Sequence, residues 1–399
     1  MAQDISNVNS AVGFTQAATI LNSIVNQATG KANLTATSTA EFVSQAQTAL
    51  KIGTEPLLNA LSTVLSKTIF SVRPYSAKFK GLQRDAVQWG NHVRKINYST
   101  DGMSNIDKYD LTNGYSDDQQ IVKKPTVLQT NWYSFDSYQD YITIPDDQLN
   151  TAFTGPDEFM RFISGIMTSV SNKHEAYKEN FARMTLANYI AATASMSRVR
   201  HLLTEFATEY SIMDSATPPA PDPTAVLPTY LDKFVKWLFA ELKVLSARFE
   251  ERSLLYHSNP TGYDIYRHTP KAQQRLYIYS PFLAQVDASV LSAAFNPSYL
   301  NLGEREEVSF WQSINTPDTI NITPSILKAN GEYQKAGSAY NKQVLGILMD
   351  YEGAGVTTID EHMEAAPHNA RGRYTTIWYG ASLRGWNDLT ENSIVLALD

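Results

Sequence analysis

Residues 144–193 read IPDDQLNTAFTGPDEFMRFISGIMTSVSNKHEAYKENFARMTLANYIAAT, and this stretch decides the fold of the chain. A short strand-like opening ends near Gly155, and Pro156 follows at a position that the first turn of a helix tolerates. From there apolar residues recur at helical spacing with polar residues opposite, which predicts one uninterrupted helix from Pro156 to Ala192. The apolar stripe consists of Phe159, Phe162, Ile163, Ile166, Met167, Val170, Tyr177, Phe181, Met184 and Tyr189.

The length of this helix says what kind of subunit it belongs to. At about 1.5 Å of rise per residue it is a rod of roughly 55 Å. A compact sphere made from a chain of this length would be only about 55 Å across, so the helix crosses the whole subunit. A coiled coil would also explain the length, but no second apolar stripe of similar extent exists in the sequence. We therefore expect a flat, elongated subunit built along this helix.

The composition of the 399-residue chain describes a folded protein with one large domain or two ordinary ones. Hydrophobic residues make up 43% and charged residues 18%, which allows a sizeable core. The net charge of −7 argues against a dedicated nucleic-acid binder. Without cysteine, disulfides, thiolate metal sites and cysteine nucleophiles are excluded. No secretory signal or membrane-length apolar run is visible, so we expect a soluble protein made in the cytoplasm.

The segments before the helix read as an arm followed by a ribbon. Up to about Gly53 the chain is poor in aromatic residues and resembles an arm that packs on something else. Residues 82–98 and 126–144 are predicted strands, the second one aromatic and partly alternating. The polar, turn-rich residues between these two strands read as the tip of a long hairpin.

The segments after the helix predict a mixed domain. An amphipathic helix is predicted at residues 230–251 and a short buried strand at 275–280, and alternation continues to about Tyr351. This pattern is typical of an α+β domain. Two more strands are predicted near the end of the sequence, at 374–380 and 393–398.

Catalytic signatures are absent from the sequence. It contains no G-x-S-x-G elbow, no H-E-x-x-H and no phosphate loop. The best metal candidate is EHMEAAPH, with Glu361, His362, Glu364 and His368, because imidazole and carboxylate groups suit zinc. Nothing in the spacing fixes their geometry, and we interpret the segment as a solvated loop. We predict no catalytic residue, no cofactor and no metal.

The order of these segments resembles the major capsid proteins of tailed bacteriophages, which have the Hong Kong 97 fold. Particular stretches are similar to the head proteins of phages of the phi-twenty-nine type, at the start of the spine helix, the central-domain helix, the approach to the extended loop and the return segment. In that order they are IPDDQLNTAF with EFMRFISGIMTSV, VDASVLSAAFN (286–296), KFKG (78–81) and NARGRYTTIWYGASLRGWN (369–387).

The resemblance implies an α+β fold with an N-terminal arm, an extended β-hairpin loop, a long spine helix and an axial α+β domain. It implies these boundaries: arm 1–55, start of the peripheral domain 56–80, extended loop 81–141, peripheral domain with spine helix 142–192, axial domain 193–355, and return strands of the peripheral domain 356–399.

The resemblance also implies a structural function without enzymatic activity, in the capsid of a virion. Copies of the chain would form hexamers and pentamers and enclose double-stranded DNA in an icosahedral or elongated head, without binding it sequence-specifically. Scaffold and portal proteins are implied partners, and head-decoration proteins are further candidates. No membrane is involved.

Contacts between subunits are expected mainly along the hairpin. Aromatic and basic residues there are the candidates, and each has an alternative role within its own subunit, as a sheet residue or a solvated charge. They are Arg94, Lys95, Lys123, Lys124, Trp132, Tyr133, Phe135, Tyr138 and Tyr141.

Two other functions stay open at this point. One is the shell of an encapsulin-like nanocompartment, which has the same fold and encloses enzymes instead of DNA. The other is a metal-dependent hydrolase that uses the loop containing His362 and His368. The hydrolase predicts activity that is lost when either histidine is replaced, whereas a shell protein predicts large particles.

Overall fold

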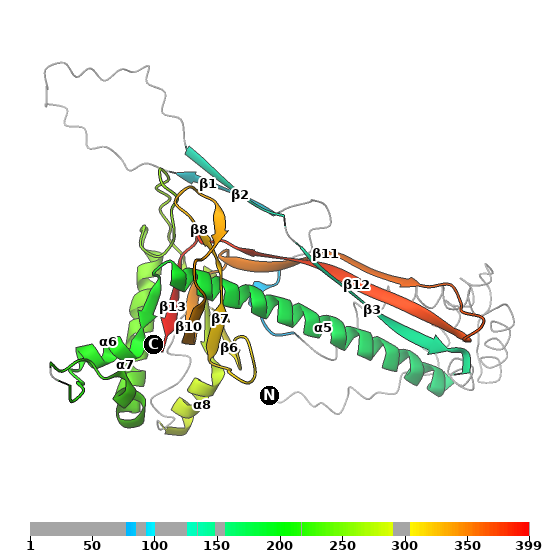
Figure 1. Ribbon diagram of the computed structural model, residues 1–399, viewed down its shortest axis with the longest axis horizontal. Coiled ribbons are helices and arrows are strands. Elements are labelled where there is room, and N and C mark those ends of the chain that lie inside the picture. Colours follow the sequence, from blue (N-terminus) through cyan, green and yellow to red (C-terminus); the bar gives the residue numbers. More distant parts are fainter. Residues whose placement is uncertain are drawn as a thin grey trace, which may run out of the picture.

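The long helix is the dominant element of the computed structural model (Figure 1). It is α5, Pro156–Ser195, with 40 residues, and so extends three residues beyond the predicted end. At about 1.5 Å per residue it is about 60 Å long. The structure describes residues 77–84, 93–99, 126–133, 135–147, 156–216, 218–289 and 304–398. The predicted arm, most of 56–80 and the predicted hairpin tip lie outside these residues.

A six-stranded sheet lies at one end of α5. Its strands run in the order β4-β13-β10-β5-β6, and β7 pairs with the first part of β10. β13 is parallel to β4 and β5 is parallel to β6, while β10 is antiparallel to its neighbours. The strands are β4 (Val199–His201), β5 (Gln274–Tyr279), β6 (Glu304–Val308), β7 (Thr319–Ile322), β10 (Tyr340–Asp350) and β13 (Ser393–Ala397).

This sheet separates two apolar cores. Along β5, Leu276 and Ile278 face one core while Tyr277 faces the other. In β13, Ile394 likewise faces the first core and Val395 the second. Both faces are covered at the centre of the sheet, which explains why β13 and the second half of β10 are almost continuously hydrophobic.

Three helices and the second half of α5 cover the two faces. The first core contains buried aromatic side chains of α6 (Leu202–Glu209), α7 (Val226–Glu250) and α8 (Ser280–Ser289). The second contains buried residues of α5 between Ala182 and Ala194. The predicted helix at 230–251 is thus α7, which starts one turn earlier and has non-helical dihedral angles at Tyr230.

A three-stranded sheet runs along α5. Its strand order is β11-β12-β3, all antiparallel, from β11 (Ala354–Ala365), β12 (Tyr374–Asn387) and β3 (Asp136–Pro145). Two expectations from the sequence are wrong here. The segment with Glu361 and His362 is not a loop, because it is paired along β11. The strand near the end of the sequence, β13, does not join the return strands but lies inside the six-stranded sheet.

We call the six-stranded sheet, the helices that cover it and the turns at its edge the body of the subunit. A two-stranded hairpin extends from this body. β1 (Val93–Ser99) and β2 (Thr126–Trp132) pair antiparallel, from Val93 with Trp132 to Ser99 with Thr126. The single strand predicted at 126–144 is therefore two strands, β2 and β3, that belong to different sheets. The strand predicted from Leu82 begins only at Val93 in the described residues.

The remaining elements are short. They are the 3₁₀ turns η3 (Lys80–Leu82), η4 (Pro223–Ala225) and η5 (Lys271–Gln273) and the paired strands β8 (Ser325–Leu327) and β9 (Tyr333–Lys335). Among the described helices, none has the length and apolar character to cross a membrane.

Candidate subunit interface at the hairpin

The outward face of the hairpin carries apolar side chains that nothing in the described subunit covers. Directly paired residues of an antiparallel ribbon share a face. Tyr98 pairs with Val127 and Ile96 with Gln129, and all four are exposed. Tyr98 has 61% of its surface exposed. A two-stranded ribbon with an uncovered apolar row is marginal by itself, which indicates an interaction surface.

The inward face lies on the body, and it carries polar contacts beside the half-buried side chains of Val93, Leu128 and Trp132. The Nζ atom of Lys95 lies 2.9 Å from Oδ2 of Asp388 and 3.1 Å from Oε2 of Glu352. It also contacts Glu391. Asn97 is buried, and its side-chain nitrogen donates to Oγ1 of Thr390 over 3.3 Å. Charges and hydrogen bonds, rather than an apolar core, hold this end of the hairpin.

The basic candidates divide accordingly. Lys95 was a candidate for a subunit contact or for a solvated charge, and in the described residues it contacts acids of its own chain. Burial alone would lower the pKa of Lys95, but Asp388 and Glu391 raise it above its ordinary value. Arg94 is exposed on the outward face. Lys123 and Lys124 lie outside the described residues.

The aromatic candidates also divide into two groups. Tyr133 and Phe135 are exposed between β2 and β3, and Trp132 is half-buried at the end of β2. Tyr141 is 53% exposed on the outer face of the three-stranded sheet, with its ring centroid 4.9 Å from that of Trp378. These positions are compatible with subunit contacts.

Tyr138 instead points toward α5. Its ring centroid lies 3.8 Å from that of Tyr177, and its hydroxyl contacts Nδ1 of His174. Burial raises the pKa of this hydroxyl, so it stays protonated at neutral pH. The structure thus gives Tyr138 contacts within its own subunit.

The sequence pattern predicts a buried position for Met184, and the structure shows this residue exposed. Met184 belongs to the predicted apolar stripe of α5, yet 69% of its surface is exposed. It lines a hollow of about 640 Å³ with Trp132, Tyr133, Phe181 and Trp386, where the hairpin meets α5 and β12. The second half of α5 is buried on several sides, so periodicity alone could not show which apolar side chain remains outside.

The segment before the hairpin is anchored by carboxylates that the sequence analysis missed. The backbone N–H groups of Ala77 and Lys78 each donate over 3.2 Å, to Glu175 and Glu179 of α5. The N–H of Phe79 donates to Glu306 of β6. Both helix glutamates are buried, and their spacing of four residues places them on one helix face. This spacing of two glutamates was the sequence feature from which a binding face on the helix could have been predicted.

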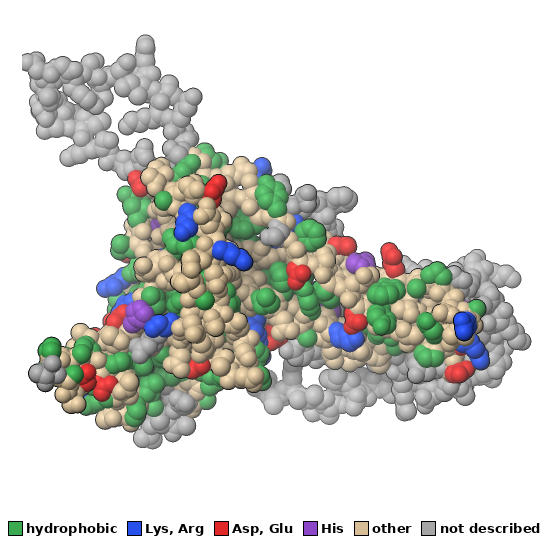
Figure 2. Space-filling model, in the orientation of Figure 1, with side chains coloured by type: hydrophobic (Ala, Val, Ile, Leu, Met, Phe, Trp, Pro, Cys, Tyr) green, Lys and Arg blue, Asp and Glu red, His purple; other side chains and the backbone are tan. Residues whose placement is uncertain are grey.

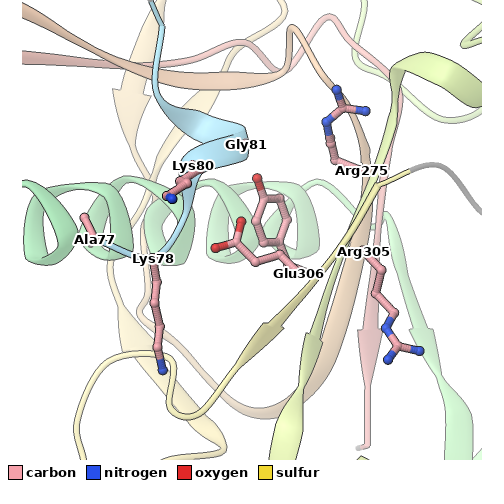
Figure 3. A pocket seen from close by; sticks show the side chains of 8 residues that line it. Ala77, Lys78, Lys80, Gly81, Arg275, Arg305 and Glu306 are labelled. Carbon is pink, nitrogen blue, oxygen red and sulfur yellow. The ribbon is translucent and has the colours of Figure 1, made fainter. Parts of the chain in front are cut away.

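Beside this anchor is a hollow of about 490 Å³ with a partly basic lining (Figure 3). Lys78, Lys80, Arg275 and Arg305 line it together with Glu306. In Figure 3 the charged ends of the four basic side chains point away from one another. They do not converge on a point where a single anion would be held.

The four candidate metal ligands Glu361, His362, Glu364 and His368 do not converge, because successive residues of β11 face opposite sides of the sheet. Glu361 faces α5, where its Oε1 lies 3.0 Å from Nε2 of His174 and 2.8 Å from Nζ of Lys178. Its neighbour His362 is exposed, and His368 contacts Thr375 over 3.1 Å. Within the part of the chain that the structure describes, no group of three or more such ligands is arranged to hold a metal.

Comparison with known proteins decides the family. A model of the phi29-like phage major capsid proteins matches residues 21–397. The chain belongs to the phi29-like phage major capsid protein family. No curated protein matches.

Solved phage capsids have a similar fold to this phi29-like capsid protein. A chain from the capsid of Staphylococcus phage Andhra is 10% identical with a TM-score of 0.53, covering 83% of this chain and 86% of that one. A chain from the structure of native bacteriophage P68 that describes its head fibre and inner core protein is 10% identical with a TM-score of 0.53, covering 82% of this chain and 86% of that one. The phi29-like capsid protein is a structural component of the virion capsid, where such proteins assemble into shells.

Proposed function

We propose that copies of this capsid protein assemble in the Hong Kong 97 arrangement, as hexamers and pentamers that close an icosahedral or elongated head. The six-stranded sheet with its helices, residues 193–355 together with β13, is the axial unit. The helix α5 and the three-stranded sheet form the peripheral unit. The hairpin, within residues 81–141, is the extended loop that overlaps a neighbouring subunit, and residues 1–55 are the arm.

The observation that carries this proposal is the outward face of the hairpin. Ile96, Tyr98 and Val127 lie on it and are exposed. Burying a side chain of this size contributes about 1.5–3 kcal/mol. The same contact would occur at many places in a shell. The sum of these small free energies would stabilise the shell without any single strong interface. Arg94, Lys123, Lys124, Trp132, Tyr133, Phe135 and Tyr141 remain the further interface candidates.

The contents of the shell are proposed to be double-stranded DNA, held without sequence-specific contacts. The net charge is −7, and on the face seen in Figure 2 acidic and basic side chains are scattered rather than gathered into one basic patch. A strongly basic lining would hold DNA by counterion release and hinder its movement. The protein acts as a structural element without catalysis, and scaffold and portal proteins are its proposed partners in assembly.

The test removes the apolar row while leaving the subunit intact. Tyr98→Asp combined with Val127→Lys replaces both apolar side chains by opposite charges on the exposed face, which keeps the strand pair stable. We expect folded protein that no longer forms particles, as measured by electron microscopy and sedimentation velocity. The nucleic-acid content of wild-type particles made in infected cells tests the proposed cargo.

The matched control is Gln129→Asp. This residue is exposed on the same face of β2, so the change adds charge without removing an apolar group. We expect particles from this variant. Normal particle formation by the double variant would exclude the hairpin as an overlapping element.

A further inference from the structure

The inner end of the hairpin is attached to the body through a buried ionic cluster, which we call the root cluster. It consists of Lys95 on β1, Arg267, Glu352 after β10, and Asp388 and Glu391 between β12 and β13. The Nη2 atom of Arg267 lies 2.9 Å from Oε1 of Glu391. Three parts of the chain that are far apart in sequence therefore meet at Lys95.

The attachment does not depend on the apolar cores. Among the described residues, none of β1 or β2 belongs to either buried apolar cluster. A second polar contact lies on the same face, where Nη2 of Arg267 donates to Oδ1 of Asn97 over 2.6 Å beside the half-buried Val93, Leu128 and Trp132. The hairpin can therefore separate from the body without opening either core, and the charges of the root cluster decide how firmly it is held.

The root cluster contains more acids than bases. Three carboxylates, of Glu352, Asp388 and Glu391, face two cations. Asp388 is fully buried and Glu391 almost so, while Glu352 is exposed. Because Glu352 is exposed to water, the buried negative charge is that of Asp388 and Glu391, with the buried Asp350 nearby. This charge is relieved most directly when one carboxyl group takes up a proton.

Glu391 is the carboxyl group placed to do this. Burial raises its pKa from 4.5 to about 7, although Lys95 and Arg267 act to lower it. Asp388 and Asp350 add to the increase. Burial also raises the pKa of Asp350, whose Oδ2 accepts a hydrogen bond of 2.6 Å from Thr269.

The other titratable groups around the cluster do not change their protonation state between pH 6 and pH 8. Burial lowers the pKa of His257 to about 4, so this ring is neutral, and it lies 3.1 Å from Asn392. Burial raises the pKa of Tyr189 and Tyr333 above the neutral range. Burial lowers the pKa of Arg198, but a guanidinium remains charged at pH 6 to 8.

We propose that the root cluster is a proton-coupled latch, in which docking of the hairpin β1–β2 onto its own subunit takes up a proton at Glu391. The inference goes beyond the proposed function, because it concerns how a subunit holds its own hairpin rather than how the hairpin meets a neighbour. When the hairpin is released, Glu391, which lies between β12 and β13, loses its contact with Lys95 and gains access to water.

The direction of the pH effect follows from linkage. The docked state binds the proton more tightly, because burial raises the pKa of Glu391 to about 7 there and contact with water returns it toward the ordinary value of 4.5. Docking is therefore strengthened as the pH falls from 7 toward 4.5, and weakened as the pH rises through 7. Between pH 8 and pH 6 the docking equilibrium changes by about tenfold in favour of the docked hairpin.

The experiment measures hydrogen exchange of the backbone amides of β1 and β2 in the full-length protein at pH 6 and pH 8, corrected for intrinsic exchange rates. We expect about tenfold greater protection at pH 6 in the wild type. Glu391→Gln, which mimics the protonated carboxyl group, should remove the pH dependence and keep high protection at both values. Strands β10 and β13 should show no comparable change.

Variants of the two adjacent basic residues separate the latch from a general effect of charge. Lys95→Met should lower the protection of β1 and β2 at both pH values, whereas Arg94→Met, on the exposed face, should leave it unchanged. Equal protection of the wild type at pH 6 and pH 8 overturns the proposal, as does a pH dependence that persists in Glu391→Gln. Neither outcome depends on whether particles form, so this test and the assembly test fail independently.

Discussion

At the scale of single residues, some positions accept only glycine, because the backbone of a neighbouring strand lies too close for a side chain. Gly346 lies in β10, between β5 and β13, next to a register shift at Val344. A Cβ atom at Gly346 would lie 2.6 Å from the backbone oxygen of Tyr277. That atom belongs to a paired strand and cannot rotate away. Only glycine lets the sheet close at this point.

We therefore expect Gly346→Ala to lower the free energy of unfolding by about 1–3 kcal/mol, because the strands must move apart. Gly165→Ala is the contrasting change. Gly165 is inside α5, and a Cβ atom there would meet nothing within 4 Å. This change should raise the free energy of unfolding by about 0.5–1 kcal/mol, since alanine loses less backbone entropy in a helix. Urea denaturation measures both, and an unchanged stability of Gly346→Ala would contradict the packing argument.

At the scale of elements, the three-stranded sheet is fastened to α5 by polar contacts along the helix. Glu361 of β11 accepts from Lys178, and Asp140 of β3 accepts from Lys173 over 2.6 Å. Burial alone would raise the pKa of Glu361, but His174 and Lys178 outweigh it and hold the pKa at about 2. The ionised carboxylate therefore stabilises the packing of sheet on helix.

The pH dependence of this contact is opposite to that of Glu391. A carboxyl group with a depressed pKa contributes stability above its ordinary value of 4.5, and loses it as the pH falls toward about 2. Glu361→Gln should cost about 1–3 kcal/mol at pH 7, and the difference in melting temperature from the wild type should shrink below pH 4.5. Glu364→Gln, exposed on the same strand, is the control and should have little effect. A constant difference down to pH 3 would contradict this role.

Helices and strands that follow from a pattern within their own residues could be predicted from the sequence. The strands with which they pair could not be predicted. The periodicity that predicts α5 lies within the helix itself, so its start was predicted correctly and its end to within one turn. The break between β2 and β3 was missed, because polar and apolar residues are interspersed in both strands and no glycine or proline separates them. Only pairing with β1 or with β12 distinguishes them.

The candidate site shows the same limit. The exposed aromatic residues of the hairpin, such as Tyr133, could be selected by composition and position. The acids beneath Lys95 come from residues almost three hundred positions away, so no local pattern could pair them. The histidine and glutamate cluster near His362 was read as a loop, because its alternation is polar on both faces and lacks the apolar signal of a strand.

At the scale of the whole molecule, the six-stranded sheet and the three-stranded sheet along α5 are linked by strands that follow one another directly in the chain. β10 continues into β11 after a short turn, and β12 leads through the turn with Asp388 into β13. The six-stranded sheet and the sheet along α5 are therefore connected twice, near the root cluster (Figure 1). A single strand of this arrangement cannot be lost without affecting both units.

Removal of β13 tests this dependence. A chain that ends before Ser393 lacks the strand between β4 and β10 and leaves the apolar side chains of both cores uncovered. We expect this truncated chain to be insoluble or unfolded by circular dichroism. Removing Asp399 alone is the control and should leave the melting temperature unchanged. A soluble, cooperatively folded truncated chain would show that β13 is dispensable.

The position of β13 also has a consequence during synthesis. Val395 pairs with Val199, so the ribosome must finish nearly two hundred further residues before the strand that completes the sheet can insert. A nascent chain cannot close its body until then, and a product of premature termination never can. If β13 is as necessary as we predict, synthesis itself selects full-length copies, because a chain that stops short of this strand has no completed sheet to bring to a head.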